Sequence, residues 1–430
     1  MNTKFQIVKI TSHDSESTIL DIPFVNLRTK AMALTRLGAY SGQVDGRETG
    51  LYYPSIAGSG SVIGALYLMS NGVQIAVSQE PTTWSAVVNV KASNRYQEDI
   101  TRFDAMNGLT FSLDETGAYT LRNPLKSYAS RYTAAASDPG VERFNNQTQI
   151  AGVQFNTDGM IFLHDYFPIL QDREVLRAIP NLQLVIVWKP SSQMPFVNDI
   201  DAPTQPAGVT FTPVIPQLLI EEDLAYIAPA VDTLDYDEIV LQTLTIPAAV
   251  DGIVSNNTIP CKVFMNRTVK DIMIFNKPLV NKAWSVAAER SVAQVDESIQ
   301  FIVNGKKLLP YNGIVTHSQK ANQFAEIYGD ICVPYACYLP SLVDTNGNIL
   351  RNDDAATAAW SSNVMIGNFS LGGVRINRFI DTNLELVYGR TGWDNGRADD
   401  DQRASFNMLL YGRCPARLVF NGDSVSKVGL

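Results

Sequence analysis

The amino-acid sequence predicts an all-β protein made of two related domains in tandem. Each half contains an apolar strand that enters an Asn-Gly pair and leaves it in a second apolar stretch, at Leu66–Ile75 and at Ile299–Leu308. Asparagine and glycine accept the positive φ angles of a two-residue hairpin turn. The expected turn residues are Asn71, Gly72, Asn304 and Gly305. Two such hairpins about half a chain apart indicate a duplicated β domain.

Strand patterns dominate the rest of the chain. Leu109–Leu113 alternates apolar and polar residues, and after a turn Tyr119–Arg122 completes a surface hairpin. Other predicted strands are apolar on both sides, which suits the middle of a sandwich that packs against a further interface. They are Leu182–Trp188, Ile272–Phe275, Leu384–Tyr388 and Leu418–Phe420.

Helix signals are short and few, at Asp172–Ile179, Lys282–Val295 and Asp353–Trp360. Short helices between strands are typical of loops in a large sandwich, and no alternation of strands with helices indicates a doubly wound nucleotide-binding fold.

The domain boundary is predicted from proline content. With 430 residues the chain is long enough for two large β domains, and Met194–Pro216 carries five prolines, which resist both helix and central strand. We therefore expect an N-terminal arm or first strand at 1–30, a first domain at 31–205 and a second at 206–430. Long polar loops, which usually carry interactions, are expected at Ser127–Gln149 and Asp344–Asn363.

Composition indicates an ordinary globular protein and argues against nucleic-acid wrapping. The formal net charge is −9 and no dense Lys/Arg run appears, whereas nucleic-acid binding depends on neutralising phosphates. The N-terminus lacks an apolar signal region, and no stretch approaches the roughly 18 apolar residues of a membrane span. Synthesis and folding in the cytosol are expected.

The cysteines and histidines favour structural roles. The four cysteines lack paired spacing, and we interpret them as buried reduced thiols, with one disulfide or a metal site as alternatives. They are Cys261, Cys332, Cys337 and Cys414. No G-x-S-x-G motif accompanies the three histidines, and His164 follows an apolar run, which favours a satisfied buried histidine over a catalytic one.

Two further patterns resemble ligand sites without meeting their requirements. Gly58–Gly64 precedes a strand and lacks the lysine of a phosphate-binding loop, so it is interpreted as a flexible entry to that strand. Acidic clusters do not follow calcium-loop spacing and are interpreted as solvated loop charge, with a glycosidase-like carboxylate pair as the alternative. They lie at 221–223, 235–238 and 399–401. We therefore predict no catalytic, cofactor-binding or metal-binding residues.

Ordered motifs in the second half resemble a known family. Asn266–Phe275, the hairpin ending Asn304–Lys307, Gly367–Ser370 with Arg375-Ile376, and Leu384–Leu386 follow one another, and Met408–Tyr411 and Arg417–Gly422 close the chain. This order is similar to the second jelly roll of double-jelly-roll, hexon-like major capsid proteins of tailless icosahedral DNA viruses. The nearest likeness is to the hexons of Polinton-like viruses and virophages.

The first half carries the matching motifs of the first jelly roll. They are Tyr53-Pro54, the Asn71-Gly72 hairpin, Leu163–Leu170 and the strand Leu182–Trp188. The resemblance thus spans nearly the whole chain, and it rests on the order and spacing of short motifs.

The resemblance implies fold, partners and location together. It implies two eight-stranded antiparallel jelly rolls with short helices in loops, and three copies forming a pseudo-hexameric capsomer. The implied role is a non-enzymatic building block of the virion shell, made in the host cytoplasm, in contact with neighbouring capsomers and with penton and minor capsid proteins. Residues 1–28 are expected to form an arm beneath neighbours, and other proteins or an inner membrane to handle the genome.

Two alternatives stay open at this point. The 17 Tyr, 5 Trp and acidic loops also fit a two-domain β-sandwich protein that binds or processes carbohydrate. A coat protein with a single jelly roll and a dissimilar projecting domain would also be rich in β structure.

Overall fold

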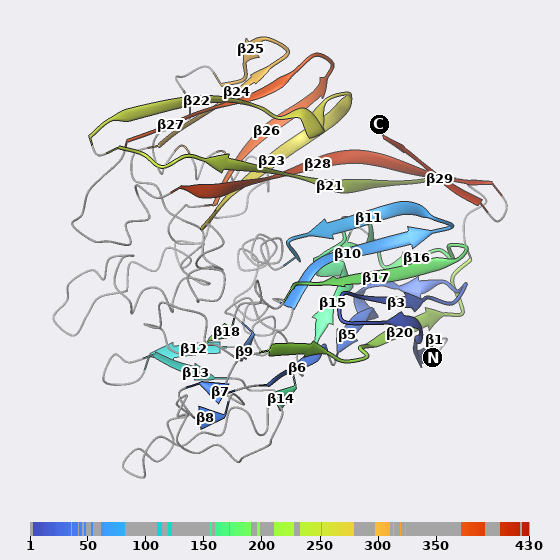
Figure 1. Ribbon diagram of the computed structural model, residues 1–430. Coiled ribbons are helices and arrows are strands. Elements are labelled where there is room, and N and C mark those ends of the chain that lie inside the picture. The colour runs from blue at the N-terminus through green and yellow to red at the C-terminus, as the bar shows by residue number, and fades with distance from the viewer. Residues whose placement is uncertain are drawn as a thin grey trace.

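Eight of the nine described strands of the C-terminal half form two facing sheets (Figure 1), and β29 (Ser424–Gly429) joins one of them by pairing with β28. The strands are β21 (Thr233–Ile246), β22 (Val254–Pro260), β23 (Arg267–Pro278), β24 (Glu297–Val303), β25 (Lys306–Lys307), β26 (Leu371–Ile380), β27 (Leu384–Thr391) and β28 (Phe406–Asn421). The sheets have the orders β21-β28-β23-β26 and β22-β27-β24-β25. Numbered 1 to 8 along the chain, these strands read 1-8-3-6 and 2-7-4-5, which is a jelly roll.

The structure is a computed structural model of the 430-residue chain. It describes residues 3–35, 37–41, 43–44, 47–48, 53–54, 62–81, 110–113, 119–122, 155–156, 160–171, 173–190, 196–197, 210–227, 233–250, 252–278, 297–309, 313, 319, 323, 371–391, 405–421 and 424–429.

The N-terminal half repeats the same strand order. One sheet has the order β11-β10-β17-β3-β2, and the other contains β1, β20, β4 with β5, and β16 with β15. Its strands are β1 (Thr3–Ile7), β2 (Lys9–His13), β3 (Ser17–Asp21), β4 (Leu27–Arg28), β5 (Ala33–Thr35), β10 (Ile63–Ser70), β11 (Val73–Gln79), β15 (Ile161–Phe162), β16 (Val175–Leu176), β17 (Leu182–Trp188) and β20 (Gln217–Asp223).

Short helices interrupt two strands of this first roll. The 3-10 helix η1 (Thr29–Ala31) separates β4 from β5, and η4 (Leu163–Asp165) with α3 (Pro168–Gln171) separates β15 from β16. β4 and β5 both pair with β20, so together they occupy the position of strand 3. β16 pairs with β4 and β15 pairs with β5, so together they occupy the position of strand 6. Counted in this way, the first roll also reads 1-8-3-6 and 2-7-4-5, and β2 is an extra edge strand.

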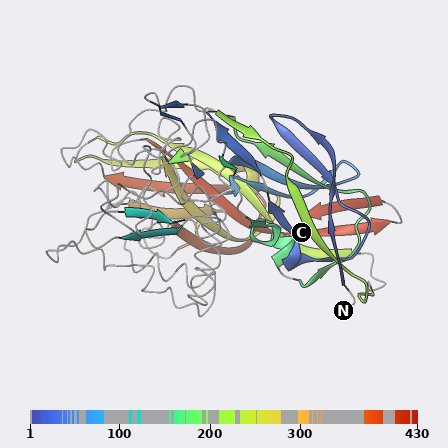
Figure 2. The ribbon, with the colours of Figure 1, turned by 90° about the horizontal axis from the view of Figure 1, so that it is seen from below.

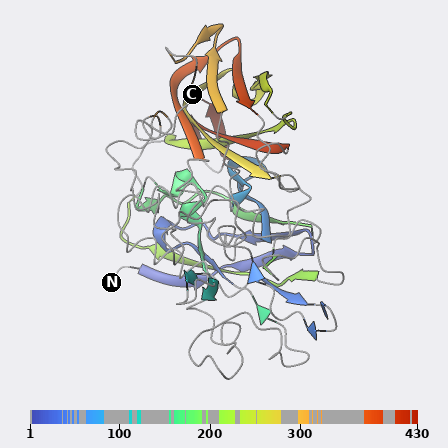
Figure 3. The ribbon, with the colours of Figure 1, turned by 90° about the vertical axis from the view of Figure 1, so that its left-hand side faces the viewer.

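The second roll lies on top of the first (Figure 3). Figure 2, viewed from below, shows the strands of both rolls overlapping along this stacking direction. Short ladders complete the described strands: β6 (Gly38–Ser41) with β14 (Phe155–Asn156) and β19 (Thr210–Pro213), β7 (Gln43–Val44) with β8 (Arg47–Glu48), β9 (Tyr53–Pro54) with β18 (Phe196–Val197), and β12 (Thr110–Leu113) with β13 (Tyr119–Arg122). The hairpin predicted at 109–122 is β12–β13.

The pairing of β19 and β20 corrects the predicted boundary at residue 206. β19 pairs with β6, and β20 pairs with β1, β4 and β5, so residues 210–223 belong with the strands of the first roll. The proline-rich segment misled the prediction because Pro213 stands at the end of its ladder, where a missing N–H donor is tolerated. The described chain passes between the rolls after residue 223.

Two local predictions also need correction. Residues 1–30 were predicted to form an arm or a first strand, and the described part of this segment forms strands of the first roll, where Leu20 of β3 and Leu27 of β4 are buried, so the arm is ruled out. The helix predicted at 172–179 is absent from the described residues of that segment, because Val175 and Leu176 pair with β4. Eight residues are too few for a stable isolated helix, so tertiary pairing overrides the local preference. The predicted helices at 282–295 and 353–360, and the predicted loops at 127–149 and 344–363, lie outside the described residues.

Both Asn-Gly pairs occupy the same place in the strand order, between strands 4 and 5 of each roll. Asn71 and Gly72 have φ angles of 50° and 78°, and Asn304 and Gly305 have 50° and 75°. Positive φ at both central residues defines the type I′ turn of a tight hairpin.

We expect Gly72→Ala and Gly305→Ala each to lower the free energy of unfolding by about 1 kcal/mol, the cost of placing an L-residue in the left-handed region. No atom lies within 4 Å of the added Cβ at either site, so backbone strain is the only cost. Urea unfolding checks the values. Gly429→Ala, equally open but without positive φ, is the control and should leave the midpoint unchanged; equal effects at all three glycines would contradict this account.

Candidate functional site

The strands of the second roll that face the first contribute to two apolar cores. Along β23, Ile272 and Ile274 lie in the core of the second roll, whereas Met273 and Phe275 between them join the apolar cluster of the first roll. On β28, Met408 and Leu410 alternate in the same way with Leu409 and Tyr411. We call the side of the 1-8-3-6 sheet that points away from its own core the outer sheet face. In the second roll the part of this face that β23 and β28 form is buried.

Along the length of β28, one side of the strand packs first into the core of the second roll and then into the apolar cluster of the first roll. Its even-numbered residues lie first in the core of the second roll (Phe406, Met408, Leu410, Cys414) and then in the apolar cluster of the first roll (Ala416, Leu418, Phe420). Strands twist along their length, so a strand of 16 residues turns one side of its backbone from one core to the other. The rolls therefore share β28 as a common wall.

Specific contacts join this wall to one side of the first roll. The Tyr236 hydroxyl donates to the Ile75 carbonyl at 2.5 Å, and the Tyr411 hydroxyl to the Glu80 carbonyl at 3.4 Å. The Arg173 guanidinium donates to the backbone carbonyl of Asp235 at 2.9 Å, and the Arg177 guanidinium lies 4.1 Å from the centre of the Phe420 ring. Burial, with the nearby charge of Glu238, raises the pKa of Tyr236 and keeps it a neutral donor.

These contacts define what we call the hairpin side of a roll. In the first roll it consists of β11, which follows the Asn71-Gly72 turn, and of residues 173–181, which lead into strand 7. The turn is tied to this segment, because the Asn181 amide donates to the Asn71 side-chain oxygen at 2.6 Å. The hairpin side of the first roll is therefore the surface that the outer sheet face of the second roll covers.

A cluster of ion pairs links β21, β23, β28 and β29 in the sheet of the second roll that faces the first roll. Asp271 on β23 is buried and accepts hydrogen bonds from Arg413 on β28, with a distance of 3.0 Å from Nε. Burial raises the pKa of Asp271, and the adjacent guanidinium opposes that rise. Glu238 on β21 bridges Arg267 at 3.3 Å and Lys427 at 2.6 Å, which ties β29 (Ser424–Gly429) to the sheet.

The outer sheet face of the first roll is exposed along β1, whereas Ala33 on β5 is only 2% exposed. In register across four strands, Ile7, Leu219, Ala33 and Phe162 form an apolar row. They alternate with the core residues Leu218, Ile220, Leu34 and Ile161, so the row points away from the core. Ile7 is 58% exposed and Phe5, two residues earlier on the same side of β1, is 72% exposed, whereas Met273 and Phe275 on the equivalent face of the second roll are 2% and 1% exposed.

The remaining predicted residues stay apart from this surface. Cys261 and Cys414 are buried free thiols, as predicted, and burial raises the pKa of each to about 12, which makes them inert; Cys332 and Cys337 lie outside the described residues. His164 is half-buried in η4 with Nε2 3.5 Å from Asp165. The acidic residues 221–223 lie on β20 and 235–238 on β21, not in loops, because both segments pair within sheets.

Within the described part of the chain, no group of three or more potential ligands is placed to hold a metal ion. No described helix combines the length and apolar character needed to cross a membrane.

Comparison with solved structures identifies the fold. No family model matches the chain, and no curated protein does. A chain of the Sputnik virophage cryo-EM structure aligns over 99% of this chain and 88% of its own, with a TM-score of 0.53 at 11% identity. The chain has the double jelly-roll fold. The mavirus major capsid protein (99% and 90% covered, TM-score 0.53, 11% identity) and the Faustovirus major capsid protein (97% and 90%, 0.53, 9%) share it.

The double jelly-roll fold confirms the predicted all-β class and, at the level of the fold, the resemblance drawn from the sequence. Sequence reasoning missed the apolar row of the first roll. A signal was present, since Phe5 and Ile7 alternate with Lys4 and Gln6 in a strand pattern, but the segment was interpreted only as an arm or a first strand, without an exposed face. Nothing in the sequence indicates which side of that strand lacks a cover.

Proposed function

We propose that this chain is a major capsid protein whose homotrimer is a pseudo-hexameric capsomer of an icosahedral DNA-virus shell. One observation carries the proposal: the strand order 1-8-3-6 and 2-7-4-5 occurs twice in one chain, in two rolls of which one is stacked on the other. Three such chains supply six equivalent rolls, which is the number a hexagonal tile needs. The mavirus and Faustovirus proteins that share this fold are major capsid proteins, which supports the role.

Assembly of the shell follows from repeated contacts of moderate strength. Each capsomer would touch several neighbours, and multivalent contacts make a stable shell from weak pairs. Penton and minor capsid proteins are the further partners we propose, and other proteins or an inner membrane would handle the genome. The role needs no catalytic residue, and the chain would be made in the host cytoplasm before it enters the virion.

The oligomeric state tests the proposal directly. We expect native mass spectrometry of the purified protein to give three times the 47.3 kDa chain mass, and negative-stain images to show pseudo-hexagonal particles. A monomer that binds or cleaves glycans would overturn the proposal in favour of a carbohydrate-active sandwich protein. A trimer that shows three well-separated lobes instead of six would also contradict it.

A further inference from the structure

We infer that the outer sheet face of the first roll docks on the hairpin side of the second roll of another copy of this chain. The inference rests on the proposed trimer and adds the two surfaces that build it. The contact between the two rolls within one chain is the starting point. That contact leaves the outer sheet face of the first roll and the hairpin side of the second roll uncovered.

The internal contact supplies the template. The outer sheet face of the second roll covers the hairpin side of the first, through the contacts of Tyr236, Tyr411 and Phe420. Because the rolls have the same strand order, each has an outer sheet face and a hairpin side. One chain therefore buries one surface of each kind and leaves the other two free.

The free surfaces lie at opposite ends of the stack. Figure 1 shows β25 at the top of the second roll, then β21, β28 and β29 above β11, and β20 with β1 at the bottom of the first roll. The contact between the rolls joins two different surfaces, so it is head-to-tail. A second copy placed below the first would therefore present its hairpin side, which contains β25, to the outer sheet face that contains β1. Heterologous contacts of this kind form a closed ring when the rotation between copies closes, and six equivalent rolls close it with three chains.

The hairpin side of the second roll carries an exposed apolar residue at the expected place. The Asn304 side-chain amide donates to the Phe379 carbonyl at 3.1 Å, and its oxygen accepts from the Thr382 backbone at 3.3 Å, which repeats the link between the first turn and strand 7. Phe379 is 52% exposed and lies five residues before strand 7 begins, as Arg177 does in the first roll. Arg177 is the residue that holds Phe420 in the internal contact.

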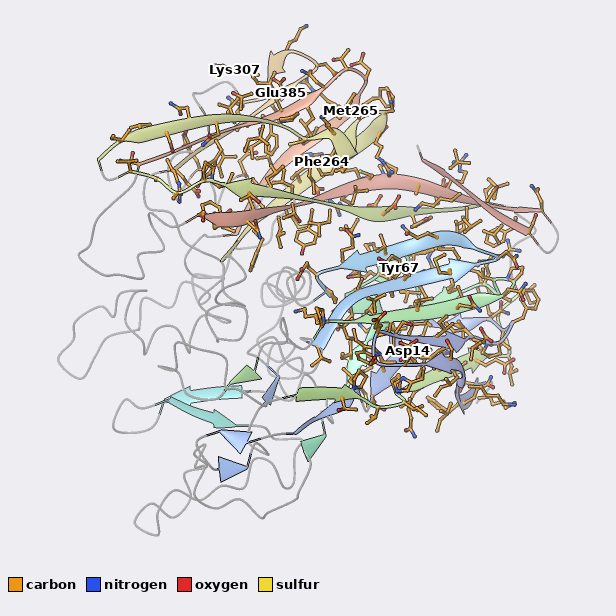
Figure 4. All side chains as sticks on the ribbon, viewed as in Figure 1. Asp14, Tyr67, Phe264, Met265, Lys307 and Glu385 are labelled. Carbon is orange, nitrogen blue, oxygen red and sulfur yellow. The ribbon has the colours of Figure 1, made fainter. Side chains whose placement is uncertain are left out.

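Charge favours the same pairing. The hairpin side of the second roll is basic, with exposed Lys306, Lys307, Arg375 and Arg378; Figure 4 shows Lys307 at the outer end of this roll, with Glu385 nearby. On the other surface, β20 ends in Glu221-Glu222-Asp223, of which Asp223 pairs with Arg28 at 3.2 Å and Glu221 lies 3.9 Å from the same guanidinium. Glu221 and Asp223 alternate with the core residues Leu218 and Ile220, so they lie on the outer sheet face, where the two carboxylates share one guanidinium and leave a net negative charge for a basic partner.

A pair of variants tests the two surfaces. We expect Phe5→Asp with Ile7→Asp, and separately Phe379→Asp, to convert the trimer to monomer in native mass spectrometry, because each buries charge in the proposed contact. Val254→Asp on β22 is the matched control: its side chain is 62% exposed, like Ile7, but lies on neither surface, so this variant should remain trimeric. Circular dichroism and urea midpoints verify that all variants fold.

Mixing the variants tests the head-to-tail geometry. The Phe379→Asp chain keeps an intact outer sheet face, and the Phe5→Asp/Ile7→Asp chain keeps an intact hairpin side, so an equimolar mixture should form a 1:1 dimer and no larger ring. A wild-type monomer would overturn both the capsomer and the interface. A wild-type trimer that survives Phe5→Asp/Ile7→Asp or Phe379→Asp would overturn the interface alone, and so would a mixture that stays monomeric.

Discussion

Gly412→Ala is expected to lower the free energy of unfolding by about 3 kcal/mol, at the upper end for overpacking a core. Gly412 lies in the middle of β28, and an added Cβ would stand 2.1 Å from Cε1 of the Phe264 ring, well inside contact distance. Phe264 is fully buried in the 3-10 helix η6 (Lys262–Phe264), so the ring has no space to move into. Figure 4 shows Phe264 between the sheets of the second roll.

Urea unfolding measures the effect, and the chain offers its own control. Gly64 also lies in a strand, but the nearest atom to its added Cβ is 3.5 Å away, so Gly64→Ala should shift the unfolding free energy by less than about 1 kcal/mol. Adding Phe264→Leu to Gly412→Ala should recover part of the loss, since the two positions couple by contact. Additive effects in that double variant would show that the clash is not the cause.

Arg413→Met is expected to cost about 3–5 kcal/mol at neutral pH, because it leaves the buried carboxylate of Asp271 without its cation. The side chain of Asp271 is 3% exposed. Arg417→Met is the control: its partner Asp235 has a side chain that is 58% exposed, and removal of an exposed pair should cost no more than about 1 kcal/mol.

The pH dependence of the Arg413→Met deficit identifies its origin. Burial already raises the pKa of Asp271 above its ordinary value, and loss of the guanidinium raises it further. A carboxyl with a raised pKa in the folded state favours folding at low pH, and this contribution is lost as pH rises through that pKa. The difference between variant and wild type should therefore be smaller at pH 5 than at pH 7.5. A deficit independent of pH would assign the loss to packing instead.

The sequence carried enough information to predict the all-β class, the duplication and the place of both hairpins. Local rules suffice there, because Asn71-Gly72 and Asn304-Gly305 encode positive φ angles in adjacent residues, and alternation encodes strands. The boundary at 206 and the helix at 172–179 failed for a common reason: β20 and β16 find their partners far away, at β1 and β4. Such pairings are decided by the assembled fold and not by neighbours in the chain.

The site was less accessible to sequence reasoning than the fold. Phe5 and Met273 both occupy strand positions with alternating neighbours, yet one is open and the other buried. What separates them is the stacking of one roll on the other. Sequence patterns that are apolar on both sides, as at Ile272–Phe275, correctly indicate a second interface, but they do not identify what fills it.

Because β28, the common wall, and its neighbour β21 place side chains in the apolar cluster of the first roll, we expect the two rolls to unfold together. If the first roll unfolded, Tyr411 and Phe420 would lose the surface that covers them, and if the second roll unfolded, the first would lose the side chains that complete its apolar cluster. Load applied to one roll therefore passes into the other through the side chains of β21 and β28 that pack against the first roll, and the 14 paired positions between these two strands hold those side chains on one surface. In a shell built from such chains, each chain would respond to internal pressure as a rigid body, and deformation would occur at the interfaces between chains.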